Sequence, residues 1–277
     1  MRTVTLNDGT VVPAIGQGTW MMGDARNRAR EVAALRAGLD LGMTLVDTAE
    51  MYGDGDAEDL VGEAIQGRRD GVFLTSKVLP SNADRRGVAR ACERSLKRLK
   101  TDRLDLYLLH WRGGTPLAET VEAFEALIRD GKIRRWGVSN FDVADMEELE
   151  ALQPTVPPAT NQVLYNPDNR GVEFDLISWQ RARGMPVTAY SPVGQGGKLL
   201  LSRALSAVAA RHAVSAAQIA IAWAIRHGDV IAIPKASTLP HVRQNAEASD
   251  IALTPEDLAE IDAAHPPPRR KRPLEML

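Results

Sequence analysis

Four polar side chains of different chemistry stand at or just after the ends of short apolar runs. They are Asp47 at the end of LVD, Tyr52 five residues later, Lys77 in FLTSKV and His110 at the end of LYLLH. A tyrosine hydroxyl can protonate an oxygen that becomes negative as a carbonyl group accepts hydride. A lysine ammonium about 4 Å away contributes on the order of 4 kcal/mol, and one pKa unit corresponds to about 1.4 kcal/mol. We therefore expect Lys77 to lower the pKa of Tyr52. Asp47 would hold Lys77 in place, and His110 would orient the carbonyl oxygen.

Other reactions lack the residues that they need. No serine or cysteine stands on the sharp strand-to-helix turn of covalent acyl transfer, and no pair of carboxylates suits glycoside hydrolysis. A metal-dependent hydrolase using Asp47 and His110 remains a weaker alternative, because no histidine pair has ligand spacing and Lys77 would repel a cation. The single cysteine, Cys92, excludes an internal disulfide and a cysteine-based metal cluster, and its helical position indicates the core. The sequence therefore predicts no metal site.

Eight short apolar runs alternate with longer amphipathic stretches and would position these groups. Runs that are apolar at consecutive positions are typical of strands buried on both faces of a parallel sheet. The predicted strands are Ala14–Gly18, Thr44–Asp47, Val72–Lys77, Leu104–His110, Ile133–Ser139, Thr160–Leu164, Pro186–Tyr190 and Val230–Pro234. The clearest helices, with apolar residues at three- and four-residue steps, are Ala29–Leu41, Val88–Leu99 and Thr120–Arg129.

Eight such units can close as a (β/α)8 TIM barrel or lie open as a doubly wound α/β sheet. The barrel is favoured because polar residues follow many strands, and because the glycine-rich stretch Gly53–Glu58 lacks a third glycine and follows the second strand. We expect one barrel domain over residues 1–277. Thr3–Leu6 and Val11–Val12 flank Asn7-Asp8-Gly9, which predicts a β-hairpin that plugs the bottom of the barrel. The loops are short, which would leave the mouth open.

The composition is that of a globular protein, with 44% hydrophobic and 25% charged residues. A formal net charge of −2 gives no global field toward nucleic acid or anionic lipid. No apolar run reaches the roughly 18 residues of a membrane span, and the first residues lack a charged-then-apolar leader. We therefore expect a cytoplasmic protein that binds neither nucleic acid nor membrane. Nothing indicates an obligate interface, so we expect a monomer.

Several stretches resemble the aldo-keto reductase superfamily, and the resemblance covers nearly the whole chain. They are GQGTWMMG, LVDTAEMYGDG, LTSKV, RLDLYLLHW, GKIRRWGVSNF, TNQVLYN, AYSPVGQG and IPKAST. The chain is most similar to short bacterial members of the methylglyoxal-reductase type. The resemblance implies a (β/α)8 barrel and NADPH-dependent reduction of aldehydes and ketones, here small reactive carbonyls such as 2-oxoaldehydes. It also implies a catalytic tetrad of Asp47, Tyr52, Lys77 and His110, with Tyr52 as general acid.

The resemblance assigns cofactor and substrate residues position by position. Ser139, Asn140 and Gln162 match residues that hydrogen-bond the nicotinamide carboxamide, and Tyr190 matches the aromatic residue stacked on its ring. The remaining cofactor positions are Thr19, Trp20, Asp47, Ser191, Val193, Gln195, Lys235, Ala236, Ser237, Thr238, His241, Gln244 and Asn245. The substrate positions are Trp20, Tyr52, His110 and Trp111. Met21, Met22 and Met51 either wall the substrate site or pack beneath the loops.

Two departures from the family concern the adenosine end of the cofactor. Many members carry Arg where this chain has His241, and Glu where it has Gln244. Lys235, Ser237 and Thr238 match the segment that grips the 2′-phosphate of NADPH, but a neutral histidine attracts that phosphate less than a guanidinium does. We therefore expect a real but less absolute preference for NADPH, with NADH as a weaker cofactor.

Two further interpretations remain open. Some proteins of this fold are NADP(H)-binding regulatory or sensor subunits with little turnover, although here all four tetrad positions are intact. The tail HPPPRRKRPLEML concentrates four basic residues, Arg269 to Arg272. We expect this segment to fold over the barrel mouth with its basic residues near the anionic cofactor.

Overall fold

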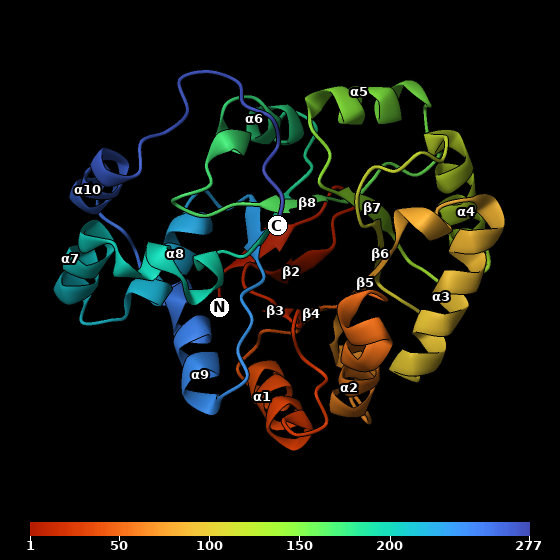
Figure 1. Ribbon diagram of the computed structural model, residues 1–277, viewed down its shortest axis with the longest axis horizontal. Coiled ribbons are helices and arrows are strands. Elements are labelled where there is room, and N and C mark those ends of the chain that lie inside the picture. The colour runs from red at the N-terminus through yellow and green to blue at the C-terminus, as the bar shows by residue number, and fades with distance from the viewer.

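Eight parallel strands form the centre of the molecule in a computed structural model that describes residues 1–277 (Figure 1). Neighbours in the sheet follow chain order, and every neighbouring pair is parallel. Both faces of the strands are covered, which explains why the runs are apolar at consecutive positions. The strands are β3 (Gln17–Gly18), β4 (Leu45–Asp47), β5 (Phe73–Val78), β6 (Leu106–Leu109), β7 (Trp136–Ser139), β8 (Asn161–Leu164), β9 (Val187–Tyr190) and β10 (Val230–Ala232).

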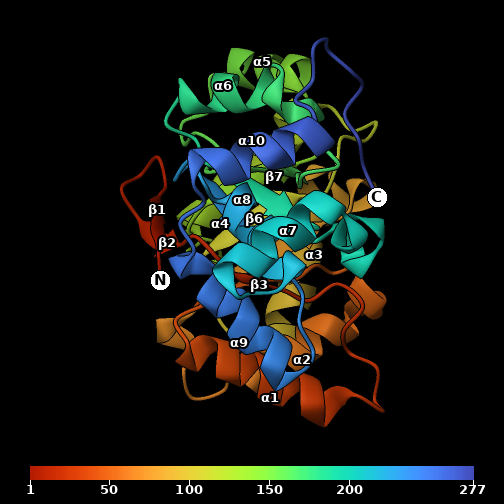
Figure 2. The same ribbon diagram turned by 90° about the vertical axis from the view of Figure 1, so that its left-hand side faces the viewer.

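Helices surround the strands as an outer ring (Figures 1 and 2). Several helices begin at capping residues. Asp84 caps α3 by accepting hydrogen bonds from two backbone N–H groups, and Thr254 and Asp257 form a capping box at the start of α10. The helices are α1 (Arg28–Asp40), α2 (Asp56–Ala64), α3 (Arg85–Leu99), α4 (Leu117–Arg129), α5 (Val143–Ala151), α6 (Leu176–Arg181), α7 (Arg203–His212), α8 (Ala216–Ala224), α9 (Leu239–Glu247) and α10 (Pro255–Ala264).

Length and composition are insufficient for any single helix to cross a membrane. Only α7 and α8 taken together meet both criteria, and they are bent by 94°.

The three predicted helices correspond to α1, α3 and α4, and each predicted strand overlaps an observed one. Seven observed strands are shorter than predicted, as in β3, where Ala14–Gly18 was predicted, because the ends of each run lie beyond the regular ladder; β5 has the predicted length but is shifted by one residue and ends at Val78. Ile15, for example, makes only a single bridge to Ala232. Cys92 is fully buried in α3, as expected.

The barrel closes between its first and last strands. Ala232 accepts a hydrogen bond from the N–H of Gly16 at 2.8 Å and donates its own N–H to the carbonyl of Ala14 at 2.8 Å. The N–H of Gly18 reaches Pro234 O at 3.1 Å. A Cβ on Gly18 would lie 2.6 Å from the carbonyl oxygen of Ile233, so only glycine permits this approach. The (β/α)8 prediction is confirmed, and the closing contacts define a seam between β3 and β10.

A β-hairpin closes the opposite end of the barrel, as predicted. Strands β1 (Thr3–Thr5) and β2 (Val11–Pro13) pair antiparallel around the Asn7-Asp8-Gly9 turn. Asn7 Nδ2 donates to Pro158 O at 2.8 Å, and Asp8 accepts from Arg135 at 2.6 Å. Figure 2 shows the hairpin and the C-terminus at opposite ends of the molecule. The hairpin is therefore a plug, and the other end is the mouth.

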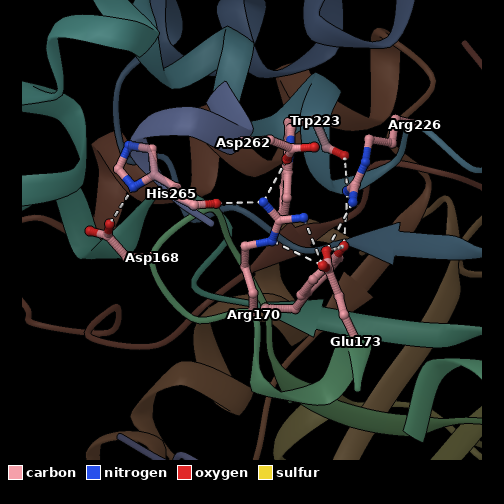
Figure 3. Close-up of polar contacts among 8 residues, drawn as sticks. Asp168, Arg170, Glu173, Trp223, Arg226, Asp262 and His265 are labelled. Carbon is pink, nitrogen blue, oxygen red and sulfur yellow. Dashed lines mark hydrogen bonds and ion pairs between the residues drawn. The ribbon is translucent and has the colours of Figure 1, made fainter. Parts of the chain in front are cut away.

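The tail that follows α10 is anchored at its base by a buried arginine. Arg170 donates to Glu173 at 2.8 Å, to Asp262 at 2.6 Å and to the carbonyl oxygen of His265 at 2.5 Å (Figure 3). The Trp223 ring lies against this guanidinium, which is centred 4.9 Å away. The start of the tail is thus fixed to the loop after β8 and to α8 and α10.

From this anchor the tail crosses toward the mouth. Lys271 pairs with Asp175 at 3.1 Å, and Glu275 accepts from Asn169 at 2.7 Å. Met276 and Leu277 line the cavity in the mouth, but none of the four basic residues does. The tail folds over the mouth as expected, whereas the expectation that its basic residues lie near the cofactor positions is wrong. Asp175, at the start of α6, holds the lysine away from them.

Candidate active site

A cavity of about 770 Å³ opens at the C-terminal ends of the strands. Most of the predicted site residues line it, namely Thr19, Trp20, Asp47, Tyr52, His110, Trp111, Ser139, Asn140, Gln162, Tyr190, Ser191, Val193, Gln195, Lys235, His241, Gln244 and Asn245. Four predicted residues do not. Lys77 is completely buried beneath the floor, and Ala236, Ser237 and Thr238 follow Lys235 at the N-terminus of α9.

The floor of the cavity is organised around the ammonium group of Lys77. Alternation along β5 turns Lys77 into the barrel, whereas Ser76 faces α2 and donates to Glu58 at 2.6 Å. Lys77 Nζ donates to Asp47 Oδ2 at 2.6 Å, to the Thr48 carbonyl at 2.9 Å and to the Tyr52 hydroxyl at 3.1 Å. Burial alone would lower the pKa of Lys77, but the attraction of Asp47 and Tyr52 outweighs it and raises that pKa. Lys77 is therefore a permanent cation held against the phenol.

The expected lowering of the Tyr52 pKa is wrong for this structure. Burial raises the pKa of Tyr52, Lys77 lowers it, and the Asp47 carboxylate raises it again, so the net change is upward. The charge of Lys77 is large enough in principle, but burial disfavours the phenolate and Asp47 screens part of the attraction. Tyr52 is therefore a protonated phenol at neutral pH.

His110 also lies at the cavity floor, and its imidazole is neutral. Burial and the positive charge of Lys77 lower its pKa to about 3. Its ring lies edge-on to the Tyr52 ring, with centroids 5.7 Å apart, and its Nδ1 atom has no hydrogen-bond partner in the protein. A neutral imidazole beside the phenol can share a hydrogen bond with an oxygen that approaches Tyr52.

Asp47 is fully engaged by protein groups. One carboxylate oxygen accepts from Lys77, and the other accepts from Gln162 Nε2 at 2.8 Å. No group of three or more His, Cys, Asp or Glu side chains is arranged to hold a metal ion.

Next to this floor, four side chains make a wall of amide, hydroxyl and aromatic groups. Ser139 Oγ donates to Gln162 O at 2.9 Å, and Tyr190 Oη donates to Asn140 Oδ1 at 2.9 Å. Burial raises the pKa of Tyr190 to about 12, so its ring remains a neutral, fixed surface. The wall offers hydrogen-bonding groups beside one flat aromatic face.

The far end of the cavity carries cationic and polar groups. Lys235 lies at the end of the β10 run, and its ammonium is 3.5 Å from Ser237 Oγ. The first turn of α9 begins directly afterwards, with Thr238 as its N-cap residue. A lysine, hydroxyl groups and a helix N-terminus together favour a phosphate group. His241, Gln244 and Asn245 continue the lining along α9.

The sequence matches the Aldo/keto reductase family over residues 14–266, which is most of the chain. This chain belongs to the aldo/keto reductase family. The resemblance stated from the motifs is confirmed, and the protein is an oxidoreductase of that family.

The relatives of this aldo/keto reductase extend over its full length. It is 54% identical to methylglyoxal reductase YeaE of Escherichia coli over 281 residues, covering 100% of this chain and 99% of the relative. It is 36% identical to a glyoxal reductase of Bacillus subtilis, covering 94% of this chain and 92% of the relative. An aldo-keto reductase of Klebsiella pneumoniae, solved in complex with NADPH, superimposes with a TM-score of 0.96 at 51% identity, covering 100% of this chain and 99% of that one.

The lining of the cavity distinguishes methionines that wall the substrate site from methionines that pack beneath the loops. Met21 and Met51 line the cavity together with Trp20 and Trp111, whereas Met22 is buried outside it. Met21 and Met51 of this aldo/keto reductase are therefore wall residues, and Met22 is a packing residue.

Several lining residues were not predicted from the sequence. They are Gly18, Pro192, Gly196, Leu200, Ser215, Ala216, Ala217, Ile233, Met276 and Leu277. One signal was readable: Ser215 and Gln218 fit the spacing of a capping box, which the structure contains at the start of α8. The tail was expected over the mouth, but contacts distant in sequence decide that Met276 and Leu277 are the tail residues in the lining.

Proposed function

We propose that this aldo/keto reductase uses NADPH to reduce small reactive aldehydes, including 2-oxoaldehydes such as methylglyoxal, to alcohols. The observation that carries the proposal is the Tyr52 hydroxyl, 3.1 Å from the buried Lys77 ammonium at the floor of a large cavity. The similarity to a methylglyoxal reductase and a glyoxal reductase supports the substrate class.

The side chains at the two ends of the cavity match the chemistry of the two ends of a phosphorylated dinucleotide. Ser139, Asn140 and Gln162 offer amide and hydroxyl groups to a carboxamide, and the half-buried Tyr190 ring offers a stacking face. The opposite end offers Lys235 and the N-terminus of α9 to a phosphate. We therefore assign the nicotinamide to the first end and the adenosine phosphate to the second.

The chain's own residues complete the reduction. NADPH, when bound, supplies the hydride to the carbonyl carbon. Tyr52 donates its proton to the carbonyl oxygen, and the Lys77 ammonium stabilises the phenolate that remains. Asp47 keeps Lys77 in place through the 2.6 Å contact. Neutral His110 orients the carbonyl oxygen toward Tyr52.

The walls favour small substrates. Trp20, Trp111, Met21 and Met51 line the cavity together with Tyr52, and the tail residues Met276 and Leu277 cover part of the mouth. We further propose that the chain acts as a single catalytic domain and as a monomer, because the hydrogen-bonded group of Asp47, Lys77 and Tyr52 at the cavity floor forms without a contribution from a partner subunit. Size-exclusion chromatography with light scattering tests the monomer.

The direct test combines turnover with cofactor binding. Loss of NADPH absorbance is followed with a panel of aldehydes that includes methylglyoxal, and NADPH affinity is measured by fluorescence titration. Tyr52→Phe keeps the ring but removes the proton, so we expect turnover to fall by at least about 1,000-fold with NADPH Kd nearly unchanged. Full activity in this variant refutes Tyr52 as the acid. NADPH binding by the wild type without turnover favours the regulatory alternative.

A further inference from the structure

Glu50 is a buried carboxylate close to Tyr52 that does not line the cavity. It stands two residues before Tyr52, and only 6% of it is exposed. A buried carboxylate is costly unless it is hydrogen-bonded. Leu79 N–H and Asn82 Nδ2 donate to Oε1 at 2.8 and 2.9 Å, and Arg94 donates to Oε2 at 3.1 Å. All three donors come from a different part of the chain.

These donors belong to the turn and the helix that follow Lys77 in the chain. Leu79 is two residues beyond Lys77, Asn82 lies in the next turn, and Arg94 is on α3. A backbone hydrogen bond joins the same two segments, since the N–H of Glu50 donates to the carbonyl of Lys77 at 3.4 Å. Glu50 therefore joins the loop that bears Tyr52 to the strand end that bears Lys77, on the side away from the cavity.

The loop around Tyr52 has little regular structure to hold it. Gly53, Asp54 and Gly55 all have positive φ, at 58°, 53° and 102°, so neither a strand ladder nor a regular helix fixes the tyrosine. Asp54 is one of the few non-glycine residue types enriched in this conformation. Side-chain contacts must therefore define the position of the phenol relative to Lys77.

A second buried carboxylate holds the other side of the same loop. Glu58, in the first turn of α2, accepts from Ser76 at 2.6 Å and from Arg98 at 3.3 Å. Ser76 directly precedes Lys77, and Arg98 is one helical turn beyond Arg94 on α3. Hydrogen bonds thus join the Tyr52 loop to residues on both sides of Lys77. Helix α3 contributes one arginine to each of the two carboxylates, Arg94 to Glu50 and Arg98 to Glu58.

We propose that Glu50 is a positioning residue for carbonyl reduction: its carboxylate, held by Leu79, Asn82 and Arg94, fixes Tyr52 at hydrogen-bonding distance from Lys77. The inference rests on the proposed role of Tyr52 as proton donor. Its consequence is kinetic, because a displacement of about 1 Å at a reacting group can cost on the order of 100-fold in rate.

The test compares Glu50→Ala with Glu50→Gln. Glu50→Ala removes every acceptor, and we expect kcat to fall by about 10- to 100-fold with NADPH Kd within about two-fold. Glu50→Gln retains a carbonyl oxygen for Leu79 and Asn82, so kcat should stay within roughly five-fold of the wild type. Glu63→Ala removes a partly exposed carboxylate of α2 that pairs with Arg28, and it is the matched control.

A second readout separates positioning from general loss of structure. A misplaced donor makes proton transfer slower, so the solvent deuterium isotope effect on kcat should increase in Glu50→Ala and stay unchanged in Glu63→Ala. If Glu50→Ala does not fold, Asn82→Ala removes one donor from the same carboxylate and should show the same isotope effect with a smaller loss of kcat.

The proposal is overturned if folded Glu50→Ala keeps its kcat, or if kcat and NADPH affinity fall together with an unchanged isotope effect. A crystal structure of the variant distinguishes this failure from failure of the proposed function. It reports the distance from Tyr52 Oη to Lys77 Nζ even if the wild type reduces no aldehyde, and we expect that distance to exceed hydrogen-bond length.

Discussion

His110 carries a protonation preference that links the active site to stability. Its folded pKa is about 3, because burial and Lys77 both disfavour the imidazolium, whereas an unfolded histidine has a pKa of about 6.5. Between these values the unfolded chain binds a proton that the folded chain does not. The contribution of His110 to folding is therefore fully present above the unfolded pKa and decreases as the pH falls toward 3.

Replacing this imidazole should reduce the acid sensitivity of the fold. From pH 7 to pH 5 we expect the wild type to lose about 2 kcal/mol more free energy of unfolding than His110→Gln, since glutamine does not titrate. Urea unfolding at the two pH values measures the difference. His241→Gln, on the exposed rim, is the matched control. Equal losses in all three proteins would mean that the folded protein protonates His110 as readily as the unfolded chain does.

In the proposed placement of the cofactor, His241 lies at the adenosine end of the cavity and should influence how strongly this end attracts a phosphate. A guanidinium at this position would add a charged, bidentate donor near Lys235. We expect His241→Arg to raise the ratio of kcat/KM for NADPH over NADH by roughly ten-fold, mainly through a lower KM for NADPH. Leu239→Arg adds a charge to the exposed side of the same helix, outside the cavity. An equal increase in this control would assign the effect to general charge rather than to contact.

At the scale of elements, local sequence patterns were sufficient to predict a helix, strand or turn wherever residues close in sequence define it. Consecutive apolar residues predicted all eight strands, and the Asn7-Asp8-Gly9 turn predicted the hairpin. The proposed tetrad residues stand at or just after strand ends, which parallel strands bring together. The cofactor positions came from the resemblance to the aldo-keto reductases, and most of them line the same cavity. The alternation along β5 explains why Lys77 points into the barrel whereas the neighbouring Ser76 faces α2.

Two features could not be predicted, because they depend on balances or contacts distant in sequence. The direction of the Tyr52 pKa depends on burial against the charge of Lys77, and burial cannot be read from residue types. The tail was expected to fold over the mouth, but the position of its basic residues, away from the cofactor positions, depends on the pairs between Lys271 and Asp175 and between Asn169 and Glu275, which are about 100 residues apart in sequence.

The tail should act as a removable wall of the substrate site. Deleting Leu274 to Leu277 removes the two lining residues and should raise kcat/KM for phenyl-substituted aldehydes at least roughly five-fold relative to methylglyoxal. NADPH Kd should stay within about two-fold, because the basic part of the tail faces Asp175 rather than Lys235. A panel of aldehydes of increasing size measures the ratio. The control replaces Arg269 and Arg270 with Ala, and an unchanged ratio in the truncated protein contradicts the wall.

At the scale of the whole molecule, the cavity lies across the seam of the barrel. Gly18 and Thr19 line it from the β3 side, and Ile233 and Lys235 line it from the β10 side. The backbone contacts across this seam are few, and glycine is required for the close approach at Gly18. A ligand that fills the cavity contacts both sides, so it should close the barrel more firmly.

NADPH should therefore stabilise the seam more than the rest of the sheet. At 100 times Kd, binding adds about 2.7 kcal/mol, which corresponds to a rise in Tm of roughly 5 °C for a chain of this size. Hydrogen exchange should slow most at the N–H groups of Gly16, Gly18 and Ala232, which cross the seam. The β5–β6 pair, where Leu108 faces Lys77, is the internal reference. Equal protection of both regions would show that the cofactor stabilises the barrel globally and that the seam has no special role.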